Sequence, residues 1–178
     1  AARAGSVNTV TIEEGEVVGY STDIGGITDV WERLPPSSPV LILGAGGASA
    51  AACIALQHRP LYIATRRYGT GKALGERLQL DLGEVRWGTS VVGAVVVNCT
   101  PLGMKGESLP QAVLELANGL LDMAYGSGRT PAATLMLDSG KPVVEGLDLL
   151  LAQAARSFRI WTACPPPLAE MRAAAENC

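Results

Sequence analysis

The segment VLILGAGGASAAACIAL (residues 40–56) constrains the fold of this chain more than any other. Its first four residues are all apolar, which is typical of a short strand buried on both faces. A glycine-rich turn follows at Gly44, Gly46 and Gly47, and the alanine-rich run after it predicts a helix to about Gln57. A strand, a glycine turn and a helix in this order indicate the first unit of a parallel α/β sheet.

Strand-like and helix-like segments continue to alternate after this unit. Apolar runs predict strands at 40–43, 61–65, 93–100, 120–125 and 142–146, with a weaker one near Val85. Amphipathic segments predict helices at 24–33, 72–80, 109–117, 130–140 and 147–161, and prolines precede a last helix. This pattern predicts the α/β class, with a doubly wound, mostly parallel sheet of Rossmann-like type.

The two ends of the chain fit this alternation poorly. β-Branched runs at 7–12 and 17–20, joined through Gly15, predict a hairpin, and Thr22 or Asp23 could cap the next helix. The chain also lacks an initiator methionine, so we expect it to be a piece of a longer protein. The expected division is a hairpin remnant of a substrate domain (1–22), a nucleotide-binding domain (23–160) and a helix returning to the substrate domain (161–178).

Composition excludes several classes of protein. With 48% hydrophobic and 17% charged residues in a chain of 178, a disordered protein is excluded. No apolar run reaches the roughly 18 residues of a membrane span. A net charge of −3 argues against a nucleic-acid partner, and four cysteines without a CxxC pair, with one histidine, argue against a metal site. We therefore expect a soluble cytoplasmic protein.

The glycine turn is typical of a dinucleotide site. Gly44 would take the tight turn, Gly46 would let the backbone approach a pyrophosphate, and Ala48 would allow close helix packing. The helix amino terminus supplies free N–H groups and partial positive charge. The predicted cofactor contacts of the turn are Gly44, Ala45, Gly46, Gly47 and Ala48. The alternative is a turn that joins strand to helix and binds nothing.

The end of the next strand favours NADP over NAD. NAD sites usually carry an acidic residue there, whereas this chain has Thr65, Arg66 and Arg67, with Lys72 soon after. A guanidinium binds a 2′-phosphate through charge-assisted bonds that a carboxylate could not make. The alternative is that both arginines only solvate a loop.

A second loop follows the strand that ends near residue 100. Asn98 and Thr100 stand at the carboxyl end of this strand, where ligands bind in open α/β sheets. They could line the cofactor crevice or simply form the turn. Cys99 has no histidine or cation near it in sequence, so a nucleophilic role is not expected.

Seven ordered segments together resemble the shikimate dehydrogenase family of NADP-dependent oxidoreductases. They are GSVNTV (5–10), GYSTDIGG (19–26), LILGAGGAS (41–49), ATRR (64–67), NCTPLGM (98–104), LDMAY (121–125) and EGLDLLLAQAARSFRIWT (145–162). The resemblance implies interconversion of shikimate and 3-dehydroshikimate, with proton transfer from the alcohol and hydride transfer to the nicotinamide.

The resemblance also implies a role for individual residues. Asp23 would be the carboxylate of a catalytic Lys–Asp pair, although Ser-Thr-Asp before a helix is also an ordinary cap. The implied substrate contacts are Asn8, Thr9, Asp23, Tyr125 and Gln153, although Gln153 could instead be a rim residue. The implied cofactor contacts beyond the glycine turn are Thr65, Arg66, Arg67, Asn98, Thr100, Gly146 and Leu149.

The chain departs from the family pattern in three respects. Ser21 stands where the family has asparagine, and Asp148 with Leu149 replaces the usual pair beside the cofactor. The family's amino-terminal substrate domain, with its Ser-x-Ser motif and catalytic lysine, has no counterpart here. The lysines present are Lys72, Lys105 and Lys141.

From these departures we expect NADP binding without appreciable shikimate turnover. We also expect self-association, for example as a homodimer, or loosely ordered ends. Two alternatives remain open: a non-catalytic binding or regulatory module, and an enzyme that also acts on quinate.

Overall fold

A central sheet of six parallel strands organises the molecule. The structure, a computed structural model, describes residues 1–126 and 128–176. The strands are β3 (Val40–Leu43), β4 (Leu61–Thr65), β5 (Gly83–Arg86), β6 (Val95–Asn98), β7 (Gly119–Asp122) and β8 (Val143–Val144). Their order is β5-β4-β3-β6-β7-β8. The chain therefore runs outward from β3 to β5, returns to the other side of β3, and continues outward from β6 to β8. The predicted doubly wound α/β class is confirmed.

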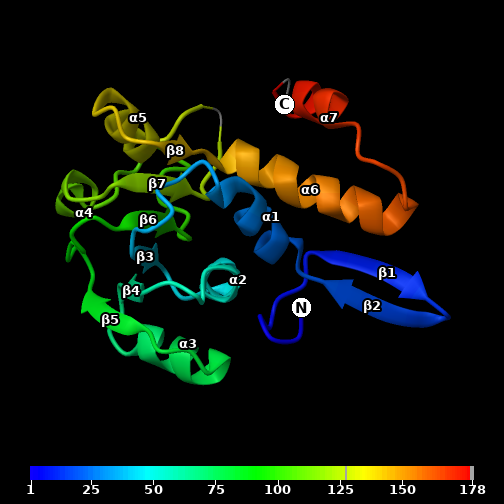
Figure 1. Ribbon diagram of the computed structural model, residues 1–178, viewed down its shortest axis with the longest axis horizontal. Coiled ribbons are helices and arrows are strands. Elements are labelled where there is room, and N and C mark those ends of the chain that lie inside the picture. Colours follow the sequence, from blue (N-terminus) through cyan, green and yellow to red (C-terminus); the bar gives the residue numbers. More distant parts are fainter. Residues whose placement is uncertain (127, 177–178) are drawn as a thin grey trace.

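Helices cover both faces of this sheet (Figure 1). One face packs against α1 (Thr22–Trp31), α2 (Gly47–Ala55), α3 (Thr70–Leu78) and α6 (Gly146–Thr162). The other face packs against α4 (Gln111–Glu115) and α5 (Pro131–Asp138). A last helix, α7 (Leu168–Glu176), lies against α6 and buries none of its residues. Residues 177 and 178 of the predicted carboxyl-terminal segment lie outside the described residues.

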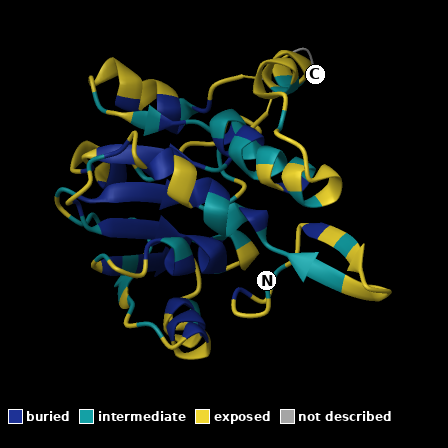
Figure 2. Cartoon of the chain, turned by 45° about the vertical axis from the view of Figure 1, so that its right-hand side comes forward, coloured by how far each residue is buried: buried dark blue, intermediate teal, exposed yellow. Residues whose placement is uncertain are grey.

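Strand β3 shows why its sequence is continuously apolar. Val40 and Ile42 join the core on the α1 side, whereas Leu41 and Leu43 join the core on the α4 side. All four are 0% exposed. Because successive side chains of a strand point to opposite faces, a strand covered on both sides has no polar position. The buried strands are the dark blue arrows in the left half of Figure 2.

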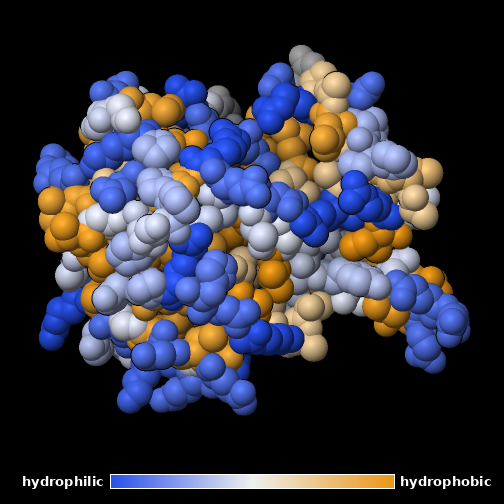
Figure 3. Space-filling model, viewed as in Figure 1, coloured by the Kyte–Doolittle hydropathy of each residue, from blue (hydrophilic) through white to orange (hydrophobic). Residues whose placement is uncertain are grey.

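The predicted hairpin is present as β1 (Thr9–Glu13) and β2 (Glu16–Tyr20). Glu14 and Gly15 form its turn with φ of 51° and 87°, the left-handed backbone that a two-residue hairpin turn requires. The hairpin extends away from the sheet (Figure 1). Apolar side chains on it are open to solvent, as the surface in Figure 3 shows.

The predicted cap of the first helix is wrong. The predicted helix at 24–33 begins at Thr22 instead, so Thr22 and Asp23 lie inside its first turn, and the cap position, Ser21, makes no side-chain cap bond. Both the backbone N–H and the hydroxyl of Thr22 donate to Asn8 Oδ1 instead. A side chain next to the hairpin therefore satisfies the helix start, which a local cap rule could not foresee.

No helix in the described part of the chain is both long and apolar enough to cross a membrane.

Candidate active site

The glycine turn after β3 leaves an accessible backbone in front of α2. Gly44 has φ of +105°, and a side chain there would lie 3.2 Å from the carbonyl oxygen of Cys99. At Gly46, the residue before the first turn of α2, an added Cβ would have no atom of the described residues within 4 Å. Gly44 is therefore required by the turn itself, whereas Gly46 keeps open the space over the helix amino terminus, as a bound pyrophosphate needs.

The rest of the turn packs against the amino-terminal segment and the core. Gly47 is exposed, and a Cβ there would lie 3.1 Å from the Cβ of Ser6. Ala45 packs against the core, and Ala48 lines a crevice described below. The predicted residues of the turn thus lie together at the carboxyl edge of β3.

The arginine loop between β4 and α3 lies at the same edge of the sheet. Thr65 is 6% exposed, and its hydroxyl donates to the carbonyl oxygen of Arg67 at 2.7 Å. Arg66 and Arg67 are exposed, and within the described residues neither forms an ion pair with a carboxylate. Two guanidinium groups without a charged partner are available to an anion.

Asn98 holds the loop after β6 from inside. It is 0% exposed, and its amide nitrogen donates to the carbonyl oxygen of Leu102 and to Asp122 Oδ1, at 2.9 and 2.8 Å. Its oxygen accepts from the backbone and the hydroxyl of Thr100. The side chain is thus occupied within the protein, and Thr100 rather than Asn98 reaches the crevice.

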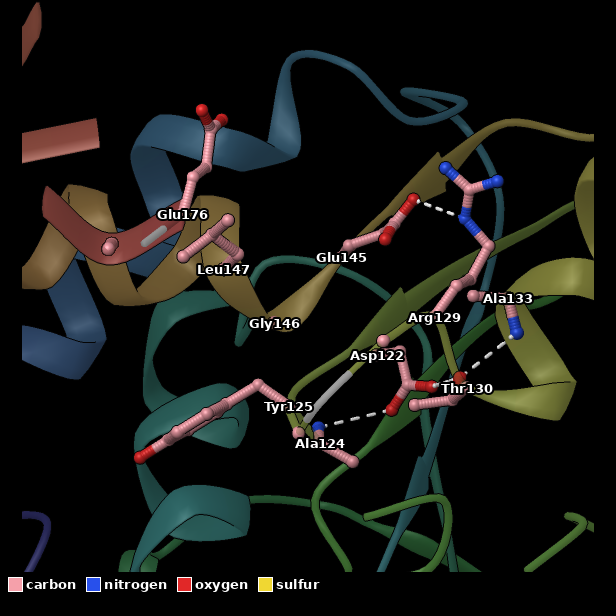
Figure 4. A pocket seen from close by; sticks show the side chains of 13 residues that line it. Asp122, Ala124, Tyr125, Arg129, Thr130, Ala133, Glu145, Gly146, Leu147 and Glu176 are labelled. Atoms are coloured by element: carbon pink, nitrogen blue, oxygen red, sulfur yellow. Dashed lines mark hydrogen bonds and ion pairs between the residues drawn. The ribbon is translucent and has the colours of Figure 1, made fainter. Parts of the chain in front are cut away.

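Asp122 is a buried residue that sequence reasoning did not single out (Figure 4). It is 1% exposed and accepts bonds from Asn98, from the backbone of Ala124 and from the hydroxyl of Thr130. Burial raises the pKa of Asp122, and these hydrogen bonds oppose the rise only in part. The group ties together the ends of β6 and β7 and the start of α5. An acidic residue at the end of an apolar strand was the available signal.

A cavity of about 520 Å³ opens beside Asp122 and is lined in part by Arg129 and Glu145, which form an ion pair at 2.8 Å. Tyr125 points away from this pair (Figure 4) and also lines the neighbouring crevice. Tyr125 is half exposed, so its ring is accessible at the boundary between this cavity and the neighbouring crevice.

Asn8, Asp23 and Gln153 meet although they lie far apart along the chain. Asn8 Nδ2 donates to Asp23 Oδ1 at 3.0 Å and to Gln153 Oε1 at 2.9 Å. Asn8 Oδ1 accepts from Thr22, which fixes the orientation of the amide. Burial raises the pKa of Asp23, and the hydrogen bond from Asn8 works against that rise. The predicted polar cluster is therefore brought together.

The structure does not bring Thr9 to this cluster's open side. Thr9 is 1% exposed, and its hydroxyl lies 2.6 Å from the hydroxyl of Ser157, which also lies 3.2 Å from that of Thr22. These buried hydroxyl groups support Asn8 from behind. Sequence reasoning missed Ser157, because a serine on an apolar helix face carries no sign of its distant partners.

A crevice of about 300 Å³ lies between the polar cluster of Asp23 and Gln153 and the loops that follow β3 and β6. The residues lining it that were predicted as contacts are Asp23, Ala48, Thr100, Tyr125, Gly146, Leu149 and Gln153. Gly146 is essential to its shape, since a Cβ there would lie 2.5 Å from the carbonyl oxygen of Ala124. The carboxylate of Asp23 and the amide of Gln153 thus line the same cavity as Ala48, at the start of α2.

Sulfur atoms form part of the crevice wall. Cys99 and Met123 both line it, and their sulfur atoms are 3.4 Å apart. Burial raises the pKa of Cys99 far above its usual value, so its thiol stays protonated and is a poor nucleophile. No group of three or more potential metal ligands occurs among the residues that the structure describes.

Asp148 does not line the crevice. It forms ion pairs with Arg33 at 2.7 Å and with Arg172 of α7 at 3.0 Å. Burial raises the pKa of Asp148, but hydrogen bonds from the two arginines outweigh this and hold the pKa below its usual value. Asp148 therefore attaches α7 to α6, whereas Leu149, the other residue of this departure from the family pattern, lines the crevice.

The fold and the crevice are those of a Rossmann-like dinucleotide-binding protein, with an acidic and amide-bearing cluster beside the nucleotide turn. The family model described as the Shikimate 5′-dehydrogenase C-terminal domain matches residues 146–176. A shikimate dehydrogenase (NADP(+)) of Archaeoglobus fulgidus is 33% identical over 98% of this chain and 69% of its own length. This chain belongs to the shikimate dehydrogenase family.

Two further comparisons agree. A shikimate dehydrogenase (NADP(+)) of Citrifermentans bemidjiense is 35% identical over 92% of this chain and 63% of its own length. The crystal structure of shikimate 5-dehydrogenase from Thermus thermophilus, in complex with NADP(H) and shikimate, superposes with a TM-score of 0.86. It is 30% identical and covers 99% of this chain and 69% of its own. The chain thus spans roughly two thirds of the length of these relatives.

Proposed function

We propose that this chain is the cofactor-binding part of an NADP-dependent oxidoreductase that interconverts shikimate and 3-dehydroshikimate. The observation that carries the proposal is the crevice of about 300 Å³ that Asp23 and Gln153 line together with Ala48, at the start of the glycine-turn helix. An alcohol held by the carboxylate and amide would lie beside a nicotinamide at the same crevice. The names of the relatives support this choice of substrate and cofactor.

The residues of this chain would act mainly by binding and orientation. The open backbone at Gly46 would receive the pyrophosphate, and Arg66 and Arg67, which form no ion pair among the described residues, would receive the 2′-phosphate. When bound, NADP supplies the hydride acceptor. The substrate hydroxyl groups would be bound by Asn8 and Gln153, while Asp23 would orient the group that takes the proton.

None of the lysines of the chain, all of which the structure describes, lines this crevice. Lys141 donates to the carbonyl oxygens of Leu114 and Glu115, and Lys72 lies on α3. We therefore propose that this chain binds NADP but does not turn over shikimate appreciably without a further domain that supplies the lysine. The division at 1–22, 23–160 and 161–178 belongs to the same proposal.

Titration decides the cofactor. Fluorescence or calorimetric titration of the chain with NADP⁺ and NAD⁺ is expected to show tighter binding of NADP⁺, and Arg66→Ala should remove most of that preference. Equal affinities, or an Arg66→Ala variant with unchanged NADP⁺ affinity, would overturn the cofactor proposal.

An assay with shikimate and NADP⁺ decides the second part. Robust turnover by this chain alone would contradict the argument from the lysines. The absence of lysine from the crevice also favours a second candidate function, a non-catalytic dinucleotide-binding module. That candidate would gain support if NADP⁺ bound normally while shikimate caused no change in the NMR signals of Asn8 and Gln153.

A further inference from the structure

The loop that carries Arg66 and Arg67 is fixed by a residue from the neighbouring edge strand. Helix α3 begins after Gly69, which has φ of +94° and provides no side chain to cap the helix. Free N–H groups at a helix start need an acceptor. The acceptor here is the carboxylate of Glu84, in the middle of β5.

The contacts of Glu84 are numerous for a half-buried side chain. Its Oε1 accepts from the backbone N–H of Gly69 at 2.9 Å and of Gly71 at 3.0 Å, and its Oε2 from that of Lys72 at 3.3 Å. The hydroxyl of Thr65 lies 3.4 Å from the same Oε1. One carboxylate thus holds both ends of the loop, at the end of β4 and at the start of α3.

Glycine at position 71 makes this reach possible. A Cβ there would lie 3.0 Å from Glu84 Oε1 and 2.6 Å from the Cγ2 of Ile63. Ile63 is also the register partner of Glu84 in the parallel β4–β5 pair. The strand register places the Glu84 side chain beside Gly71, and the missing side chain of Gly71 leaves room for its carboxylate.

A second contact from β5 acts on the same loop. Arg86 is the register partner of Thr65, and its guanidinium carbon lies 5.8 Å from the centre of the Tyr68 ring. Such a cation–π contact restrains an exposed tyrosine. The loop is thus attached to β5 at Thr65, Tyr68 and Gly69, while Arg66 and Arg67 between them stay free of ion pairs in the described part of the chain.

We infer that Glu84 is a positioning residue for discrimination between NADP and NAD, an inference that rests on the proposed function. Because Glu84 already occupies the first N–H groups of α3, a 2′-phosphate is left to the arginine side chains. Their geometry depends on the loop that Glu84 fixes. Loss of this anchor weakens the contacts that only NADP makes, and leaves the adenosine and pyrophosphate contacts common to both cofactors.

The test compares dissociation constants for NADP⁺ and NAD⁺ in the full chain and its variants. Glu84→Ala is expected to weaken NADP⁺ binding about tenfold and NAD⁺ binding about twofold or less, as the loss of a preorganised loop implies. Glu84→Gln keeps an acceptor for the N–H groups and should retain the NADP⁺ preference. Glu84→Asp, which withdraws the carboxylate by one methylene, should lose part of it and serves if the alanine variant does not fold.

Glu76→Ala is the matched control, since Glu76 is an exposed carboxylate on the same helix that forms no ion pair with the loop among the described residues. It should leave both affinities unchanged. A preference for NADP⁺ that survives in both Glu84→Ala and Glu84→Asp, or that is lost equally in Glu76→Ala, overturns the inference. A wild-type chain without any NADP⁺ preference would instead be a failure of the proposed function, recognisable before any variant is made.

Discussion

The side-chain nitrogen of Asn8 lies 3.0 Å from a carboxylate oxygen of Asp23, and this hydrogen bond couples the start of the hairpin to the first helix. It also lowers the pKa of Asp23 against the stronger effect of burial. The protonation of the proposed catalytic carboxylate therefore depends on a residue outside its own helix.

Asn8→Ala should raise the pKa of Asp23 further. Because the variant also removes the acceptor for the Thr22 N–H, it should lower the free energy of unfolding by about 1–3 kcal/mol. Carbon-13 NMR titration of the aspartate carboxyl groups measures the pKa. Asp148, ion-paired with Arg33 and Arg172, is the control, and its pKa should stay below its usual value as in the wild type. A fall in the pKa of Asp23 would contradict the direction derived from the Asn8 bond.

Asp122→Asn should change how stability depends on pH. Because the pKa of Asp122 is raised above the ordinary 3.8, the folded state binds a proton that the unfolded state has lost between these two values. Ionisation of Asp122 therefore costs stability as the pH rises through its folded-state pKa, and the cost is absent below 3.8. Urea unfolding at a series of pH values should show a smaller loss of stability with rising pH in Asp122→Asn than in the wild type.

That experiment must compare how steeply the free energy of unfolding changes with pH in the two proteins, because Asp148 makes stability depend on pH in the opposite direction. Its lowered pKa provides stability that is lost as the pH falls through its folded-state value. Identical slopes in the wild type and Asp122→Asn would show that Asp122 titrates alike in both states.

Alanine substitutions at two glycines of the nucleotide turn should affect stability and cofactor binding differently. Gly44→Ala should lower the free energy of unfolding by about 1–3 kcal/mol, since φ is +105° and the Cys99 carbonyl is close. The added methyl group of Gly46→Ala meets no atom within 4 Å in the described part of the chain and should change the free energy of unfolding by less than about 0.5 kcal/mol.

For cofactor binding we expect the opposite order, with Gly46→Ala as the more damaging substitution. A methyl group at position 46 would enter the space proposed for the pyrophosphate and should weaken NADP⁺ and NAD⁺ binding alike, by about tenfold. Thermal unfolding and titration of both variants check the pair. Unchanged cofactor binding in Gly46→Ala would place the pyrophosphate elsewhere.

The fold was largely predictable because its strongest signals are local. The apolar run at 40–43, the glycine turn and the alanine-rich helix each carry their own pattern, and the structure confirms all three. The boundaries were less accurate: the strand predicted at 93–100 extends only over Val95–Asn98. The strand ends at Asn98 because the side chain of this residue bonds to the following loop at Thr100 and Leu102, which turns the backbone away from the sheet.

The candidate site was predictable only in part. Periodicity places Gln153 on a helix, but the resemblance to a family was needed to bring it to Asn8, which lies 145 positions earlier. The supporting groups Ser157 and Glu84 were missed because their partners come from distant strands and helices. The cap of α1 was predicted wrongly for the same reason, since its acceptor is the distant Asn8.

The last prediction concerns the hairpin. Ile12 and Val17 are cross-strand partners and are 73% and 76% exposed, so an apolar pair stands on a two-stranded sheet with open edges in the described part of the chain. Such a surface favours association between copies. Size-exclusion chromatography with light scattering should show a mass that rises with concentration, and the double variant Ile12→Lys and Val17→Lys should shift it towards the monomer. Val92→Lys, at an equally exposed valine away from the hairpin, is the control and should leave the mass unchanged. A wild-type chain that stays monomeric at every concentration would exclude the hairpin as an association surface.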